Sequence, residues 1–68
     1  MNEVNNIPKV NDEIDVTIES VGKQGDGVAK HNGFIIFVPD TKKGENVRIV
    51  ITKVFPNYGF AEVIQTLE

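Results

Sequence analysis

Aromatic and cationic side chains occur together between positions 23 and 60 of this 68-residue sequence. Side chains of these two types are suited to binding a ligand with flat rings and negative charges. The candidate rings are Phe34, Phe37, Tyr58 and Phe60, and the candidate cations are Lys23, Lys30, Arg48 and Lys53. Flat rings stack on unpaired bases, and cations meet the phosphates between those bases. These side chains are therefore the candidates for a surface that binds single-stranded nucleic acid.

Strand alternation decides which rings can face a ligand, because a small core also needs apolar side chains. In the segment 58–64, small and apolar side chains alternate with the rings. If Ala61 faces the core, Tyr58 and Phe60 face outward. We therefore expect these two rings to be available for stacking.

The segment 34–38 is apolar on both faces, so its two rings are harder to assign. Phe34 and Phe37 have opposite parity, and a regular strand buries at most one of them. Phe34 adjoins a turn and is expected to be exposed. Phe37 and Phe55 are expected in the core, although Phe37 also stays a candidate for contact with the ligand.

Other chemistry has little support in this sequence. It contains no cysteine and a single histidine, His31, beside a turn. The glycine-rich stretch 22–27 has the spacing of a phosphate-binding loop, but Val28 and Ala29 stand where that loop needs Lys and Ser or Thr. The acidic residues at 12, 13 and 15 suit a solvated strand face. We expect no enzyme, no cofactor and no metal site.

Composition describes a small globular domain with an uneven charge distribution. The formal net charge is −3, and 40% of the residues are hydrophobic. Residues 20–55 carry six bases against three acids, whereas acids outnumber bases on either side. A locally positive face is therefore compatible with the acidic total. The sequence has neither a signal-peptide pattern nor an apolar run that could span a membrane, so we expect a cytoplasmic protein. We also expect it to be a monomer.

The elements that must position these side chains are short strands. Residues 1–9 are predicted to be a flexible tail, and residues 10–68 to form the domain. The expected strands are 13–21, 28–30, 34–38, 46–54 and 58–64. Asn32 and Gly33 carry the strongest short hairpin signal. Five strands with turns every eight to twelve residues predict an all-β meander, closed into a small OB-like or SH3-like β-barrel.

The order of several short blocks resembles a TRAM domain over about residues 10–64. The blocks are DVTIE at 15–19, GDGVA at 25–29, GFIIFVP at 33–39, GE at 44–45, VR at 47–48 and FAEV at 60–63. The resemblance implies a small OB-like barrel that binds RNA. Such domains occur appended to tRNA-modifying enzymes and, in archaea, as free-standing chains thought to act as RNA chaperones like the bacterial cold-shock proteins.

The resemblance also implies roles for individual positions. Lys30 and Lys23 occupy places where the family is often basic. The family's aromatic places in the third strand and its closing aromatic pair correspond to Phe34, Phe37, Tyr58 and Phe60.

Two functions from different classes follow. The first is RNA binding, either as a cold-shock-like chaperone or as a module for tRNA or other RNA. In it, Phe34, Tyr58 and Phe60 stack bases while Lys23, Lys30, Arg48 and Lys53 meet phosphates. The alternative is a protein-interaction module associated with RNA-modifying or translation machinery, because small barrels often offer an edge or groove to a peptide.

Overall fold

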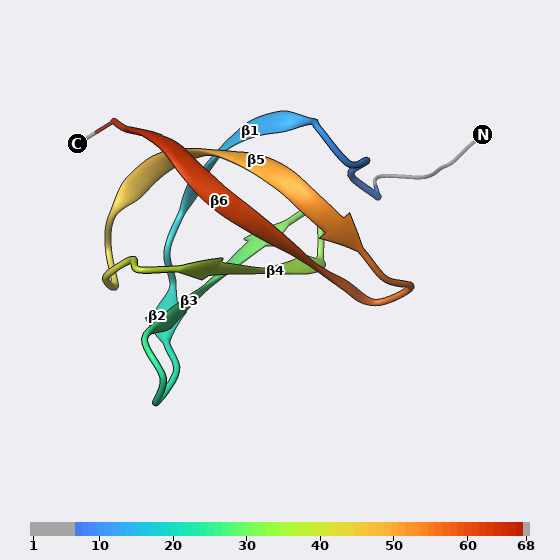
Figure 1. Cartoon of the computed structure of the whole chain (residues 1–68). Helices are drawn as coiled ribbons and strands as arrows, with labels where there is room; N and C mark the ends of the chain where they lie inside the picture. Colours follow the sequence, from blue (N-terminus) through green and yellow to red (C-terminus); the bar gives the residue numbers. More distant parts are fainter. Residues whose placement is uncertain (1–6, 68) are drawn as a thin grey trace.

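Residues 7–67 are described by a computed structural model, and all of their regular structure is β-strand (Figure 1). The strands are β1 (Glu13–Thr17), β2 (Ser20–Val21), β3 (Asp26–His31), β4 (Phe34–Pro39), β5 (Asn46–Val54) and β6 (Tyr58–Thr66). They form one sheet in the order β1-β5-β6-β4-β3-β2. The predicted all-β fold is confirmed. The described part of the chain holds no helix long and apolar enough to cross a membrane.

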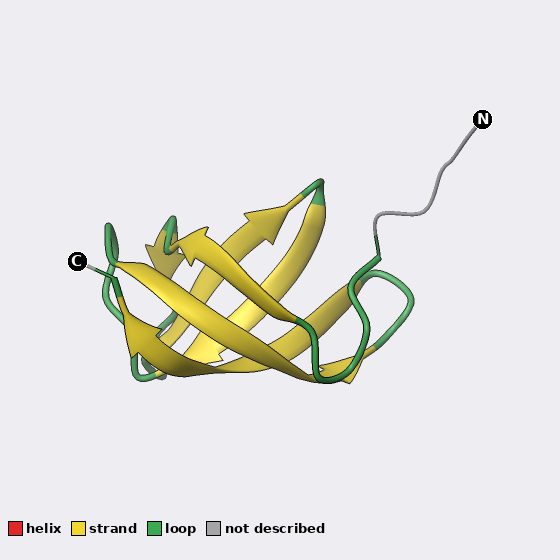
Figure 2. Cartoon of the chain, turned by 90° about the horizontal axis from the view of Figure 1, so that it is seen from above, coloured by secondary structure: helices red, strands yellow, loops and turns green. Residues whose placement is uncertain are grey.

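The sixth strand arises because the segment expected as one strand, 13–21, bends at its middle. β1 pairs with β5, whereas β2 pairs with β3. At the bend, the amide of Ile18 donates to the Glu45 carbonyl at 2.9 Å, and the amide of Glu19 donates to the Val28 carbonyl at 2.8 Å. The chain thus changes hydrogen-bonding partners between adjacent residues. The bend joins the two edges of the sheet, which curls into a barrel-like shape (Figure 2).

The expectation of a simple meander is wrong at one place. A meander would pair β4 with β5, but β6 lies between them and runs parallel to β4. β5 instead pairs with β1, which leaves its other edge for β6. This order brings two segments that are distant in the sequence side by side, with Phe37 opposite Phe60 and Ile35 opposite Tyr58.

The core is mainly aliphatic and follows the period-two alternation of the strands. Its buried residues are Val16, Ile18, Ala29, Phe34, Ile36, Val38, Val47, Ile49, Ile51 and Ala61. Burying such side chains stabilises a fold by about 1.5–3 kcal/mol each for the larger ones. Phe34 is the one ring among these core residues.

The hairpin predicted at Asn32 and Gly33 is confirmed. Both residues have positive φ, 54° and 83°, as a two-residue turn with a right-handed strand twist requires. The turn joins β3 to β4 with His31 opposite Phe34.

The predicted tail, 1–9, falls mostly outside the described residues. Within the described part, Pro8 is buried. A turn follows it and lies along β5, where the Asn11 amide donates to the Ile51 carbonyl at 2.7 Å. The Ile51 amide in turn donates to the Asp12 carbonyl at 2.9 Å.

Gly59 makes room for the buried ring. It faces inward from β6, and a Cβ there would lie 2.8 Å from the Lys53 carbonyl oxygen and 3.2 Å from a ring carbon of Phe34. A strand glycine often marks such a close approach.

We expect Gly59→Ala to lower the free energy of unfolding by about 1–3 kcal/mol, because the added methyl group meets backbone as well as a packed ring. Urea unfolding followed by circular dichroism measures this change. Gly22→Ala is the matched control, since its nearest new neighbour lies 3.7 Å away. Equal stability of the two variants would contradict the close packing of Gly59 against Phe34 and the Lys53 carbonyl.

Candidate nucleic-acid interface

Four of the five aromatic rings of the sequence contact one another on the outer wall of the barrel. We call this group, formed by Phe37, Phe55, Tyr58 and Phe60, the aromatic surface. Phe55 and Tyr58 stack, with ring centroids 5.0 Å apart and an interplanar angle of 21°. The remaining contacts are edge-on or tilted, at 5.7–5.9 Å. A contiguous apolar group on a protein surface marks a candidate interaction site.

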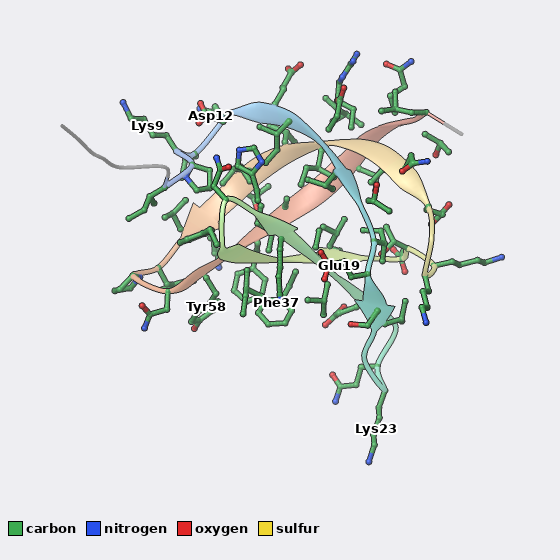
Figure 3. The ribbon with its side chains drawn as sticks, turned by 180° about the vertical axis from the view of Figure 1, so that it is seen from behind. Lys9, Asp12, Glu19, Lys23, Phe37 and Tyr58 are labelled. Carbon is green, nitrogen blue, oxygen red and sulfur yellow. The ribbon has the colours of Figure 1, made fainter. Side chains whose placement is uncertain are left out.

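Strand order and alternation place these rings together. Phe37 points outward from β4, and its neighbours Tyr58 and Phe60 come from β6. Phe55 lies in the turn before β6, where its amide donates to the Tyr58 carbonyl at 2.8 Å. Figure 3 shows Phe37 and Tyr58 projecting on the side of the sheet from which the loop with Lys23 also extends. The predicted outward orientation of the rings of β6 fits this arrangement.

The expectation for Phe34 is wrong. Its side chain is 7% exposed and packs in the core against Gly59, so it offers no face to a base. The reason is the space that Gly59 leaves on the inner side of β6, which the ring fills. Parity then sends Phe37 outward, where it is half-buried among the other rings, so the expectation that Phe37 lies in the core is wrong too.

The expectation that Phe55 lies in the core is also wrong. It is 39% exposed. It comes directly after Val54, the last residue of β5, and so lies outside the sheet that encloses the core. Sequence reasoning therefore missed Phe55 as a surface candidate. The signal that could have found it is Pro56, which marks the end of the strand.

A β-bulge brings Lys53 to the aromatic surface. The alternation of Val47, Ile49 and Ile51 would turn Lys53 inward, but the pairing shifts between Ile51 and Lys53. Thr52 is the extra residue, and its hydroxyl donates to the Phe60 carbonyl at 3.2 Å. Lys53 consequently lies opposite Phe60 and is exposed.

Lys23 and Lys30 lie in different surroundings. Lys23 belongs to the loop between β2 and β3 and shares a shallow hollow with Phe37. Lys30 lines a separate hollow beside Asp15, Thr17 and Glu19. The two carboxylates there weaken the attraction of that hollow for a phosphate. The structure thus places Lys53 opposite Phe60 and Lys23 in a hollow with Phe37. Lys30 is a diagonal neighbour of Phe37 across β3 and β4, but it lines the hollow that contains the acids.

Arg48 lies at the other end of β5 and is held by neighbouring strands. It is five residues from Lys53, about 16 Å along a strand. Its Nε donates to Asp15 Oδ1 at 2.8 Å, its Nη2 to Asp15 Oδ2 at 3.2 Å, and its Nη1 to Gln65 at 3.3 Å. The hydrogen bonds between Arg48 and Asp15 lower the pKa of Asp15 below its ordinary value of 3.8 and raise the pKa of Arg48. The structure does not bring Arg48 to the aromatic surface.

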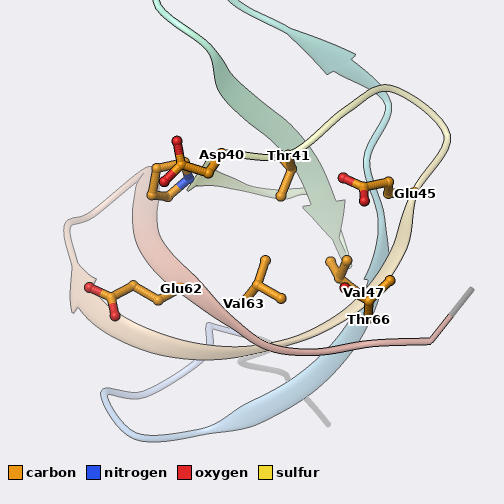
Figure 4. A pocket seen from close by; sticks show the side chains of 8 residues that line it. Asp40, Thr41, Glu45, Val47, Glu62, Val63 and Thr66 are labelled. Atoms are coloured by element: carbon orange, nitrogen blue, oxygen red, sulfur yellow. The ribbon is translucent and has the colours of Figure 1, made fainter.

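A further hollow is lined by acidic and apolar side chains (Figure 4). Asp40, Glu45 and Glu62 surround it, while Thr41 and Val63 point toward its centre. Its charge is unfavourable for phosphate. Within residues 7–67, no group of three or more His, Asp or Glu side chains is arranged to hold a metal ion.

Residues 8–64 match the family model of the TRAM domain. This chain belongs to the TRAM family. TRAM domains are RNA-binding modules, which agrees with rings and lysines on one outer wall. The resemblance seen in the sequence is thereby confirmed, and it covers nearly the whole of the described chain.

Relatives include both small proteins and longer enzymes and factors. The chain is 49% identical to an uncharacterized protein of Methanocaldococcus jannaschii over 60 residues, which is 87% of this chain and 78% of that protein. It is 49% identical over 57 residues to ribosomal RNA large subunit methyltransferase E of Methanococcoides burtonii. It is 46% identical over 55 residues to translation initiation factor 2 subunit beta of Picrophilus torridus.

Those two matches cover 82% and 81% of this chain but only 21% and 27% of the longer proteins. The TRAM domain is therefore one part of each of them. A conserved protein of Methanococcus maripaludis, solved in solution, superposes with a TM-score of 0.77 at 41% identity, covering 82% of this chain and 80% of that one. The barrel-like fold is shared by this small archaeal protein.

We expect Phe34→Ala to lower the free energy of unfolding by about 3–5 kcal/mol, because it empties the core beside Gly59. Phe37→Ala should lower it by clearly less, since that ring is half-buried on the outer wall. Thermal and urea unfolding of both variants measure the difference. A larger loss for Phe37→Ala would show that Phe37, and not Phe34, faces the core.

The ion pair between Asp15 and Arg48 predicts a pH dependence of stability. The folded state lowers the pKa of Asp15, so the pair stabilises the fold above pH 3.8 and this contribution is lost as the pH falls through the lowered value. Asp15→Asn should therefore reduce the loss of stability on acidification. Arg48→Gln should have the same effect on the pH profile. Urea unfolding between pH 2 and 6 measures the free energy of unfolding against pH. Profiles like that of the wild type in both variants would contradict a stabilising role for this ion pair.

Proposed function

We propose that the aromatic surface binds unpaired bases of RNA, while Lys53 and Lys23 contact the adjoining phosphates. The observation that carries the proposal is the position of the rings. Four of five rings lie together on the outer wall, whereas the core is filled by aliphatic side chains and Phe34. Packing within so small a domain would favour the opposite distribution. The TRAM family supports RNA as the ligand.

Physical magnitudes favour weak binding that tolerates many sequences. Stacking contributes about 1–3 kcal/mol per base and suits any base, because each base has a π-face. Two lysines adjoin the surface, so few counterions are released and the salt dependence is shallow. The net charge of −3 adds no long-range attraction for RNA.

Preference for unpaired bases would give the protein the activity of an RNA chaperone. Bases within a duplex are already stacked on their neighbours and cannot lie on protein rings. A protein that binds the open form of a hairpin more tightly shifts the equilibrium toward that form, without ATP. The unpaired loops of a structured RNA such as tRNA would suit the same surface. We place this activity in the cytoplasm, as the sequence predicts.

Single substitutions at the rings test the proposal. We expect Phe37→Ala and Phe60→Ala each to weaken binding of a fluorescein-labelled ten-uridine RNA about tenfold, which corresponds to the loss of one stacked base. Fluorescence anisotropy at two salt concentrations measures the dissociation constant and the salt slope. Ile64→Ala is the matched control, because it shortens a 47% exposed apolar side chain outside the aromatic surface.

The same variants test whether hairpin opening depends on the aromatic surface. Wild-type protein should open a hairpin labelled with a fluorophore and a quencher, and the ring variants should open it less at equal concentration. Failure of the wild-type protein to bind single-stranded RNA would refute the proposal. Ring variants that stay folded and bind RNA like the wild type would favour the protein-interaction alternative.

A further inference from the structure

A shallow hollow opens beside the aromatic surface, between the loop that joins β2 to β3 and the outward face of β4. It is lined by Gly22, Lys23, Gln24, Asp26, Val28 and Phe37. Phe37 belongs both to this hollow and to the aromatic surface. A strand of RNA that lies across the rings can therefore continue into the hollow.

The register of β3 and β4 places an acidic side chain close to the ring. Val28 lies opposite Phe37, and Asp26 lies opposite Pro39. Asp26 and Lys30 are thus the two diagonal neighbours of Phe37, at spacings of about 7–8 Å between Cα atoms, and of these two Asp26 lines the hollow. The rings of β6 approach Phe37 from one side of β4, and the hollow lies on the β3 side. A base on that side of the ring would bring its edge toward Asp26.

Backbone hydrogen bonds hold the loop around the hollow. The Gly22 amide donates to the Asp26 carbonyl at 2.8 Å, and the Gly25 amide donates to the Gly22 carbonyl at 3.0 Å. Among the described residues, no side chain pairs with the Asp26 carboxylate. A carboxylate next to a surface that receives phosphates weakens binding by repulsion unless it contacts the ligand by another means.

Base edges differ in what they offer a carboxylate. Guanine presents two neighbouring donors, N1–H and the N2 amine, to the two carboxylate oxygens. Adenine and cytosine present one amine beside an acceptor nitrogen, and uracil presents one N–H between two carbonyls. A paired set of charge-assisted hydrogen bonds is stronger and more selective than a single one. The carboxylate in this position therefore distinguishes guanine from the other bases.

We infer that the hollow is a subsite that prefers an unpaired guanine. The base stacks on Phe37, and the Asp26 carboxylate accepts hydrogen bonds from N1 and N2. The Gln24 amide is placed to donate to the base, and Lys23 meets its phosphate. The inference rests on the proposed RNA binding and adds a base preference to it.

Labelled RNAs that differ at one position provide the test. The probes are a ten-uridine RNA and the same RNA with one central guanosine, inosine or adenosine. Wild-type protein should bind the guanosine RNA about tenfold more tightly than ten uridines. Inosine lacks the N2 amine and should fall between them. This comparison needs no variant and so does not depend on a substituted chain that folds.

Asp26→Asn should reduce the guanosine preference to less than twofold. It should also tighten binding of ten uridines slightly, because it removes a negative charge near the phosphates. Glu13→Gln is the matched control, because it removes one negative charge from β1, at the other edge of the sheet, and should keep the preference. Circular dichroism checks that both variants fold.

A wild-type protein that binds all four RNAs equally would overturn the guanine subsite and leave the proposed RNA binding intact. A preference that survives in Asp26→Asn would also overturn it. Absence of binding to any of the RNAs would refute the proposed function and the subsite together.

Discussion

The position of β6 between β4 and β5 is the constraint on which the surface of this protein depends. β5 pairs with β1, so β4 has no partner on that side until β6 enters as a parallel neighbour. Parallel pairing then sets Phe37 opposite Phe60, although the two residues are far apart in the chain. In a simple meander these rings would lie on strands separated by β5, and no continuous aromatic surface would form.

Two irregular features adapt the sheet to this surface. Gly59 leaves space inside the barrel for Phe34, and its neighbours on β6, Tyr58 and Phe60, face outward. The bulge at Thr52 turns Lys53 from the inward parity of β5 to the outer wall. Bulges redirect side chains in this way at the edges of functional sites. The burial of Phe34, the outward rings of β6 and the exposure of Lys53 thus depend on the same short stretch of β5 and β6.

Charge is arranged locally in this acidic chain. Asp15 and Arg48 form an ion pair between β1 and β5, and Lys30 lies beside acidic side chains. The basic side chains are therefore not concentrated on one face. The cations that adjoin the rings are Lys23 and Lys53. Binding that rests on stacking more than on charge follows from this distribution. It also gives a reason for Asp26 beside Phe37, since its carboxylate adds selectivity where electrostatic attraction is already small.

The local pattern of residues determined the all-β class, the hairpin at Asn32–Gly33, the outward rings of β6 and the TRAM resemblance, because each is written in alternation, turn chemistry or short blocks of neighbouring residues. Tertiary structure alone decided the rest. Phe34 is buried because Gly59, 25 positions later, leaves room for its ring. Arg48 forms an ion pair because Asp15 lies beside it on a neighbouring strand. Strand parity allows one ring of 34–38 inside, but only packing between distant strands selects which one.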